Sequence, residues 1–276
     1  MIKRILVGLS GTPYTASAVR TATELARIHR GSVTGITIVD VHHLEEDVVP
    51  AALQYSPLVK HAVDVPLRDV EERVTQTLEE FRGACADAEV PHEVRRETGE
   101  PLSLFLSEWR YHDLAILGLR GLFDYGLLHE PHDALYRLFS HGVDPIIAVA
   151  KESRPIRRAL VAYHGTVDAA KAMKRFLELR LWPDLELHLV CFEKTHEEAQ
   201  HLLSEAGDYC RIHGFEAKTH HELHPARKAL LPFSVELDAD IVVLGGGSRG
   251  LVARKIFGDT LLTAIRESER PLFLSH

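Results

Sequence analysis

Glycine-rich segments that follow short apolar runs are the parts of this 276-residue chain best suited to binding chemistry. They are Gly8 to Thr12, Gly118 to Gly121, Ala162 to Thr166 and Gly245 to Gly250. Glycine lets the backbone approach a ligand closely, and unpaired N–H groups at the start of a following helix attract phosphate. Strand-to-helix turns also use glycine for geometry alone. Because ligands of open parallel sheets bind beyond the carboxyl ends of the strands, each half of the chain has one candidate anion-binding edge.

The histidines of the chain could bind a metal ion. The chain has 18 histidines; His220, His221 and His224 gather around Glu222, and a second group surrounds His129. Neighbours on a strand point to opposite faces, so His220 and His221 are poor ligands for one metal ion. We interpret both groups as exposed histidines at the ends of elements.

Composition excludes several classes of partner. The net charge is −8 and the pI about 6.1, so the surface repels nucleic acid and anionic membranes, and we expect neither as a partner. Cys85, Cys191 and Cys210 are an odd number of distant cysteines, which argues against a disulfide framework or a zinc ribbon. No signal peptide or long apolar run is visible, and we expect a cytoplasmic protein.

The chain contains an internal repeat. Three pairs of segments recur in the same order: Ile5–Thr12 with Ala159–Thr166, Asp113–Gly118 with Asp240–Gly245, and Asp144–Val149 with Arg270–Leu274. Leu6 and Leu160 are 154 positions apart, whereas Gly118 and Gly245 are 127 apart. The first half therefore carries an insertion of about 27 residues, which we place around residues 41–60, where prolines break any regular pattern.

The elements expected in each half alternate between strands and amphipathic helices. Continuous β-branched runs such as Ile241 to Leu244 suit strands buried on both faces, and alternation implies right-handed crossovers. We therefore expect an α/β fold with two doubly wound, parallel, five-stranded sheets as a tandem repeat. The short charged segment before Pro155 separates domain 1, residues 1–150, from domain 2, residues 156–276.

This layout resembles the universal stress protein family over nearly the whole chain, in its tandem two-domain form. The resemblance implies the adenine nucleotide alpha hydrolase-like fold, with the last strands, Val143 to Ala150 and Pro271 to Ser275, paired antiparallel at the domain contact. ATP-binding members carry Gly-x-x-Gly, nine residues, then Gly followed by Ser or Thr. That loop wraps the ribose and phosphates, and the ends of the first two strands receive the adenine.

The second half matches this nucleotide pattern in part. Gly245 fits the first glycine and Gly258 the third, while Ser248 stands at the second and Asp259 replaces the hydroxyl residue, with Thr260 directly after it. The Asp259 carboxylate would repel a triphosphate unless Mg²⁺ bridged the two. The residues that the resemblance assigns to the nucleotide are Ala162, His164, Val190, Gly245, Gly247, Ser248, Arg249, Gly258, Asp259 and Thr260, with Asp259 as the metal ligand.

The first half departs from the pattern, because Pro131 falls where the third glycine belongs and has no N–H to offer. An acidic residue common near the adenine is replaced by Ser10 and His164 in the two halves. We therefore expect a stress-response regulator, with self-association open, that binds ATP or a related nucleotide in its C-terminal domain and is not a dedicated enzyme. The alternatives are a nucleotide-independent dimeric interaction module and a slow ATP-hydrolysing enzyme.

Overall fold

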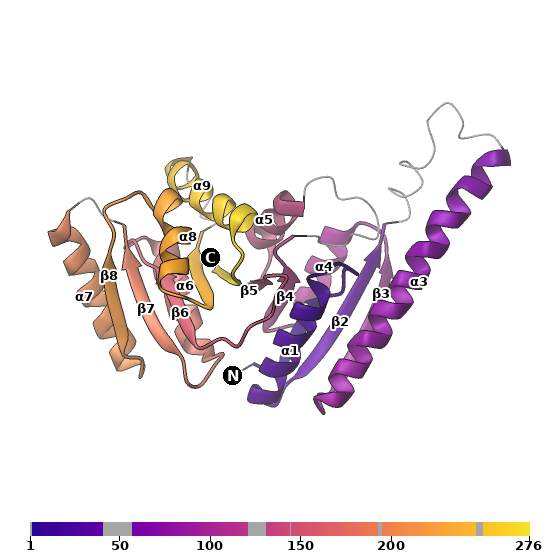
Figure 1. Ribbon diagram of the computed structural model, residues 1–276, viewed down its shortest axis with the longest axis horizontal. Helices are drawn as coiled ribbons and strands as arrows, with labels where there is room; N and C mark the ends of the chain where they lie inside the picture. The colour runs from indigo at the N-terminus through magenta and orange to yellow at the C-terminus, as the bar shows by residue number, and fades with distance from the viewer. Residues whose placement is uncertain (1, 41–56, 121–130, 144, 193–194, 247–250) are drawn as a thin grey trace.

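The computed structural model describes residues 2–40, 57–120, 131–143, 145–192, 195–246 and 251–276 (Figure 1). For residues 57–67, 131–133 and 251–258 it describes the backbone alone. Most of the expected insertion at residues 41–60 lies outside these ranges, as do Gly247, Ser248 and Arg249. Residues 57–60 of the expected insertion begin a long helix.

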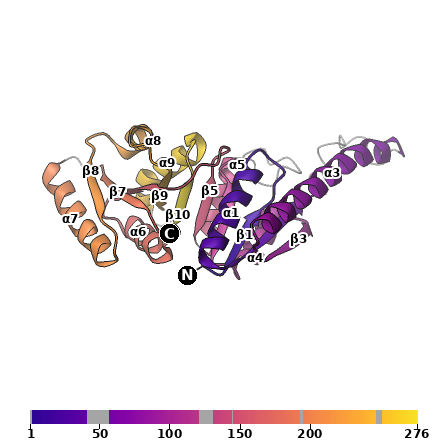
Figure 2. The same cartoon turned by 60° about the horizontal axis from the view of Figure 1, so that its bottom comes forward.

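The N-terminal half alternates strands and helices. Its elements are β1 (Arg4–Gly8), α1 (Thr15–His29), β2 (Ser32–Val39), α3 (Pro57–Asp87), β3 (His92–Thr98), α4 (Pro101–Trp109), β4 (Leu114–Gly118), α5 (Pro131–His141) and β5 (Ile146–Val149). The 31-residue α3 runs on beyond the edge strand β3 in both views (Figures 1 and 2).

The C-terminal half repeats the same order. Its elements are β6 (Arg158–Ala162), α6 (Val167–Leu179), β7 (Glu186–Cys191), α7 (His196–Ile212), β8 (Ala217–His221), α8 (Ala226–Glu236), β9 (Ile241–Gly245), α9 (Leu251–Glu267) and β10 (Leu272–Ser275). The division at residues 150–156 stays a prediction.

All ten strands form one sheet in the order β3-β2-β1-β4-β5-β10-β9-β6-β7-β8. Neighbours within each half are parallel. In the part of the chain that the structure describes, the one antiparallel contact joins β5 to β10 at the centre (Figure 2), with Phe273 opposite Ile147. Both the doubly wound fold and the antiparallel central pair are therefore confirmed. This pairing leaves β3 and β8 as the two edges of the sheet.

Helices cover both faces of the sheet and create two cores. The core on one face includes side chains from α1, α3, α6 and α7, and the core on the other includes side chains from α4, α5, α8 and α9. Inner strands such as β9 read as continuous apolar runs because both of their faces are buried, and Ile241 to Leu244 are all buried, whereas the edge strands β3 and β8 are polar.

Both halves have the same aspartate contact at the start of their first strand. In the N-terminal half an Asp113 carboxylate oxygen accepts the backbone N–H groups of Lys3 and Arg4 at 2.7 and 2.9 Å. In the C-terminal half Asp240 accepts those of Arg157 and Arg158, both at 2.9 Å. Each aspartate satisfies backbone donors that the sheet leaves unpaired, and so fixes one strand against its neighbour.

The repeated Gly-Thr pair makes the turn from the first strand into the first helix. Gly11 and Gly165 both have left-handed backbones, with φ of 63° and 68°, a conformation that costs a side chain about 1–2 kcal/mol. Thr166 then caps α6, since its hydroxyl accepts the N–H of Ala169 at 3.3 Å. The turn brings residues 162–166 to the carboxyl edge of the sheet.

Candidate functional site

A cavity of about 270 Å³ lies at the carboxyl ends of β6, β7 and β9. The last residues of the strands, the start of α8 and one residue of α9 surround it. The lining residues are Ala162, Tyr163, His164, Ala169, Phe192, Leu223, Pro225, Ala226, Arg227, Leu244, Gly245 and Thr260. Among the described residues the lining is mostly apolar and aromatic, with one arginine and two hydroxyl groups, which suits a flat ring system that carries an anionic group.

Gly245 allows β9 and α6 to pack closely beside this cavity. A Cβ at this position would lie 2.2 Å from the carbonyl oxygen of Asp168 and 2.8 Å from the backbone nitrogen of Ala169. The end of β9 therefore approaches the first turn of α6 more closely than any side chain permits. This close approach places the start of α6 beside the cavity.

The polar groups of the cavity come from three elements. His164 and Tyr163 follow β6, Arg227 belongs to α8, and Thr260 belongs to α9, where it is buried. Burial raises the pKa of the Tyr163 hydroxyl above its usual range. A tyrosine that stays protonated can donate a hydrogen bond to a ligand oxygen or nitrogen.

An ion pair lies at the α8 side of the cavity. The Arg227 guanidinium is 3.5 Å from the Asp259 carboxylate, and both side chains are more than half exposed, at 62% and 54%. Such an exposed pair is worth at most about 1 kcal/mol, so a ligand phosphate can compete with Asp259 for Arg227.

At the corresponding strand end of the N-terminal half, hydroxyl side chains contact one another. The Ser10 hydroxyl lies 3.0 Å from that of Thr12 and 3.3 Å from that of Thr15, and all three side chains are buried. Tyr14 packs against Gly118, where an added Cβ would lie 2.6 Å from the Tyr14 Cβ. The two halves therefore differ at the site where the sequences diverge, with Ser10 in one and His164 in the other.

Arg120, which follows β4 in the N-terminal half, has a structural role. Its guanidinium donates to the carbonyl oxygen of Arg266 at 2.8 and 3.1 Å and to that of Ser268 at 2.9 Å. These carbonyls lie at the carboxyl end of α9, where a cation also offsets the helix dipole. Arg120 thus ties the N-terminal half to the last helix of the C-terminal half.

The structure brings four of the predicted site residues together. Ala162, His164, Gly245 and Thr260 all line the cavity. Val190 pairs with Ala162 in the sheet and is fully buried, and Phe192, two residues later, lines the cavity instead. Asp259 lies next to Thr260 and contacts Arg227, while Gly247, Ser248 and Arg249 lie outside the described residues.

Gly258 differs from its expected surroundings. We expect it in the phosphate loop, but the structure places it within α9, where a backbone N–H normally bonds to the carbonyl four residues earlier. Its part in ligand binding stays a prediction. Sequence reasoning missed several lining residues, of which Arg227 is the charged one and Phe192 an aromatic one. Arg227 matters most for the choice of ligand. Its only signal is a cation three residues after His224, at the start of the helix that follows β8.

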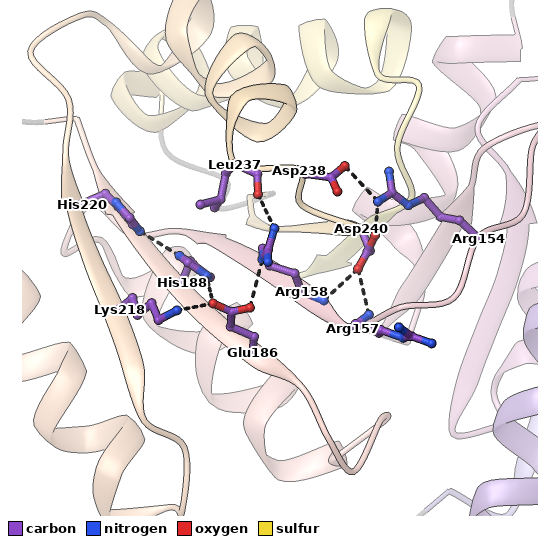
Figure 3. A network of polar contacts seen from close by, with 10 residues as sticks. All are labelled: Arg154, Arg157, Arg158, Glu186, His188, Lys218, His220, Leu237, Asp238 and Asp240. Atoms are coloured by element: carbon purple, nitrogen blue, oxygen red, sulfur yellow. Dashed lines mark hydrogen bonds and ion pairs between the residues drawn. The ribbon is translucent and has the colours of Figure 1, made fainter.

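A second polar cluster lies at the opposite edge of the sheet (Figure 3). The Glu186 carboxylate binds Lys218, Arg158 at 3.1 Å and the Nε2 of His188 at 3.1 Å, which lowers the pKa of Glu186 to about 2. The Nδ1 of His188 is 2.8 Å from the Nε2 of His220. Burial lowers the pKa of both histidines.

Within the described residues, no helix is both long and apolar enough to cross a membrane. The cytoplasmic address stays a prediction.

Comparison with known proteins agrees with this fold. No family model matches the chain. A universal stress protein of Synechocystis sp. is 24% identical over 165 residues, which cover 58% of this chain and 56% of that protein. The crystal structure of a universal stress protein from Archaeoglobus fulgidus covers 99% of this chain and 95% of its own, with 18% identity and a TM-score of 0.69.

The resemblance to universal stress proteins is therefore confirmed, and the two halves of the chain have the tandem α/β fold of these proteins. The match to the Synechocystis protein spans little more than half of that protein's length. At such identities the likeness establishes the fold, and the ligand has to be argued from the cavity itself.

Proposed function

We propose that this chain is a tandem universal stress protein that binds ATP or a related adenine nucleotide in its C-terminal half and serves as a stress-response regulator. The observation that carries the proposal is the cavity at the carboxyl ends of β6, β7 and β9, where the doubly wound fold places its ligands. The family resemblance supplies the adenine nucleotide, and the aromatic and cationic lining agrees with it.

The residues around the cavity have distinct roles in this proposal. Tyr163, His164 and Phe192 surround the base, and Ala162 leaves room for it at the end of β6. Thr260 and Arg227 bind the phosphates, together with the segment Gly247 to Arg249 that the sequence assigns to them. Val190 supports the site from below, by its pairing with Ala162.

Mg²⁺ would enter together with the nucleotide. Magnesium is usually bound by one or two carboxylates together with phosphate oxygens and water, so Asp259 alone is enough on the protein side. Its carboxylate is more than half exposed, and its partner Arg227 is the cation that phosphate would engage. Binding of the nucleotide would therefore release Asp259 from Arg227 for the metal ion.

The test is calorimetric titration of nucleotide-free protein with ATP, ADP, AMP and GTP, with and without Mg²⁺. Arg227→Ala should weaken ATP binding about tenfold or more, since a hydrogen bond to a charged group contributes about 1.5–3 kcal/mol. Thr260→Val keeps the shape of the side chain and removes its hydroxyl, so it should also weaken binding. Arg175→Ala, on the exposed side of α6, is the matched control and should bind as the wild type does.

Two other outcomes correspond to the alternative functions. If no nucleotide produces heat with protein that mass spectrometry shows to be empty, the proposal is wrong and the dimeric interaction module is favoured. Self-association of two chains is tested separately by light scattering, because β5 already pairs with β10 inside one chain.

The hydrolytic alternative has one motif in its favour. Gly246 to Gly250 spells Gly-x-Ser-x-Gly between β9 and α9, the strand-to-helix setting in which hydrolases hold a nucleophilic serine. If phosphate release proceeds over many turnovers and is abolished by Ser248→Ala, the chain is an enzyme. Binding without turnover supports a regulator.

A further inference from the structure

The dipeptide His220-His221 at the end of β8 forms two different histidine pairs. Successive strand residues point to opposite faces of the sheet, as expected from the sequence. His220 meets His188 of the neighbouring strand β7, whereas His221 meets His196, the first residue of α7. The same sheet edge thus carries two imidazole pairs with different geometry.

The pair of His188 and His220 is a hydrogen bond. The two nitrogens are 2.8 Å apart, and the rings are nearly parallel, with an interplanar angle of 15°. The other nitrogen of His188, Nε2, donates its N–H to the Glu186 carboxylate, which can only accept a hydrogen bond. Nδ1 of the neutral His188 ring therefore accepts from Nε2 of His220. A separation of 2.8 Å leaves no room for a metal ion between the nitrogens.

The pair of His196 and His221 has a wider gap. The two Nδ1 atoms face each other at 3.4 Å, which is long for a hydrogen bond between nitrogens. Zn–N bonds are about 2.0–2.1 Å, so two imidazoles bound tetrahedrally to one ion have nitrogens about 3.3–3.4 Å apart. The observed separation therefore matches two ligands of a single metal ion.

The surroundings of this second pair suit an ion that keeps water ligands. Both histidines line an open groove of about 480 Å³ between α7 and β8, together with Gln200, Asp208 and Glu216. Within the described residues, no three His, Cys, Asp or Glu side chains form a metal-binding group, so water completes the coordination. The Asp208 carboxylate is paired at 2.6 Å with Arg211, which also lines the groove, whereas Glu216 adds a negative charge that favours a cation.

The scaffold holds the pair in place before any ion binds. Thr195 caps α7 by accepting the N–H of Glu198 at 3.3 Å, which fixes the helix start that carries His196. His221 is the last residue of β8, whose neighbour Glu222 donates its N–H to the carbonyl of Cys191 at 2.9 Å. A preformed pair loses little conformational entropy when it binds an ion.

We propose that His196 and His221 form a two-imidazole binding site for a divalent transition-metal ion. Affinity should follow the order of metals for nitrogen ligands, with Cu²⁺ bound more tightly than Ni²⁺ or Zn²⁺. The proposal rests on the geometry of the two histidines and does not depend on nucleotide binding.

The test uses tag-free, chelator-treated protein titrated with Cu²⁺ and Zn²⁺ against a chromophoric competitor. We expect one site per chain that is tighter than the background from the other histidines. His196→Ala and His221→Ala should each weaken it at least about tenfold, since even the loss of a group that only supports a ligand costs about 10–100-fold. His201→Ala removes an exposed histidine from the same helix and is the matched control, which should leave the affinity unchanged.

Electron paramagnetic resonance of the Cu²⁺ form gives a readout that a structural role would not produce. The wild type should show coupling to two imidazole nitrogens, and each single variant to one. Because imidazole binds metal only when neutral, the affinity for the metal ion should fall as the pH is lowered from about 8 to about 5. The proposal is refuted if the wild type has no saturable site, or if the site persists unchanged in both single variants.

Discussion

The glycine at the end of β9 provides the sharpest test of how the cavity is built. Gly245→Ala adds one methyl group, whose carbon would lie 2.2 Å from the Asp168 carbonyl oxygen, well under the 3.0 Å that real Cβ atoms respect. The obstacle is backbone rather than a flexible side chain, so either α6 or β9 must move by at least the missing 0.8 Å.

The cost follows from the packing of these two elements. Extra methyl groups forced into a packed interior typically cost about 1–3 kcal/mol, and we expect the upper part of that range because a helix start must shift. The first turn of α6 also borders the cavity, so the same displacement should weaken nucleotide binding. Urea unfolding measures the free energy, and calorimetry measures the affinity.

Gly83→Ala is the matched control for this change. Gly83 lies on an exposed face of α3, and a Cβ there meets nothing within 4 Å. Alanine in a helix is about 0.8–1 kcal/mol more favourable than glycine, so this variant should be slightly more stable than the wild type. The same chemical change thus has opposite expected signs at the two positions. If Gly245→Ala unfolds at the same urea concentration as the wild type, the close approach of β9 and α6 is refuted.

Three further predictions concern contacts outside the cavity. The lowered pKa values of His188 and His220 mean that the unfolded chain takes up protons first, so stability should fall as pH drops below about 6.5. His220→Gln should reduce that slope in urea unfolding at several pH values, and an unchanged slope would contradict it. Arg120→Ala should lower the free energy of unfolding by about 1–3 kcal/mol, because it removes the hydrogen bonds to the end of α9. Arg120→Lys should recover only part of this loss, because lysine lacks the planar guanidinium. Full recovery with lysine would contradict the prediction. Asp240→Ala should lower the free energy of unfolding by about 2–3 kcal/mol. The loss should exceed that of Asp113→Ala, because Asp240 is the more buried of the two carboxylates that accept backbone N–H groups. Equal losses in thermal unfolding would contradict this ranking.

Much of the fold could be predicted because local sequence patterns determine the strands and turns. Runs such as Ile241 to Leu244 are apolar without alternation, which only a strand buried on both faces requires. The repeated Gly-Thr pair also has a local cause, since Gly11 and Gly165 need the same left-handed backbone.

The candidate site was only partly predictable, because its residues come from distant parts of the chain. Ala162, His164, Gly245 and Thr260 follow a motif, and the structure places them around one cavity. Arg227 follows no motif and enters the site only because α8 begins beside α9. Likewise, the spacing of Gly258 fits a loop, yet the structure places it inside α9.

The sequence by itself determined the alternating α/β fold of each half and the edge where a ligand would bind, because hydrophobic periodicity and glycine positions act locally. The pairing of the last strands was predicted from the family resemblance. Only the tertiary structure showed which side chains line the cavity of the C-terminal half. It also decided which histidines face one another across 2.8 Å or 3.4 Å. Those properties depend on side chains that are remote in the chain and are brought together by the packing of helices on the sheet.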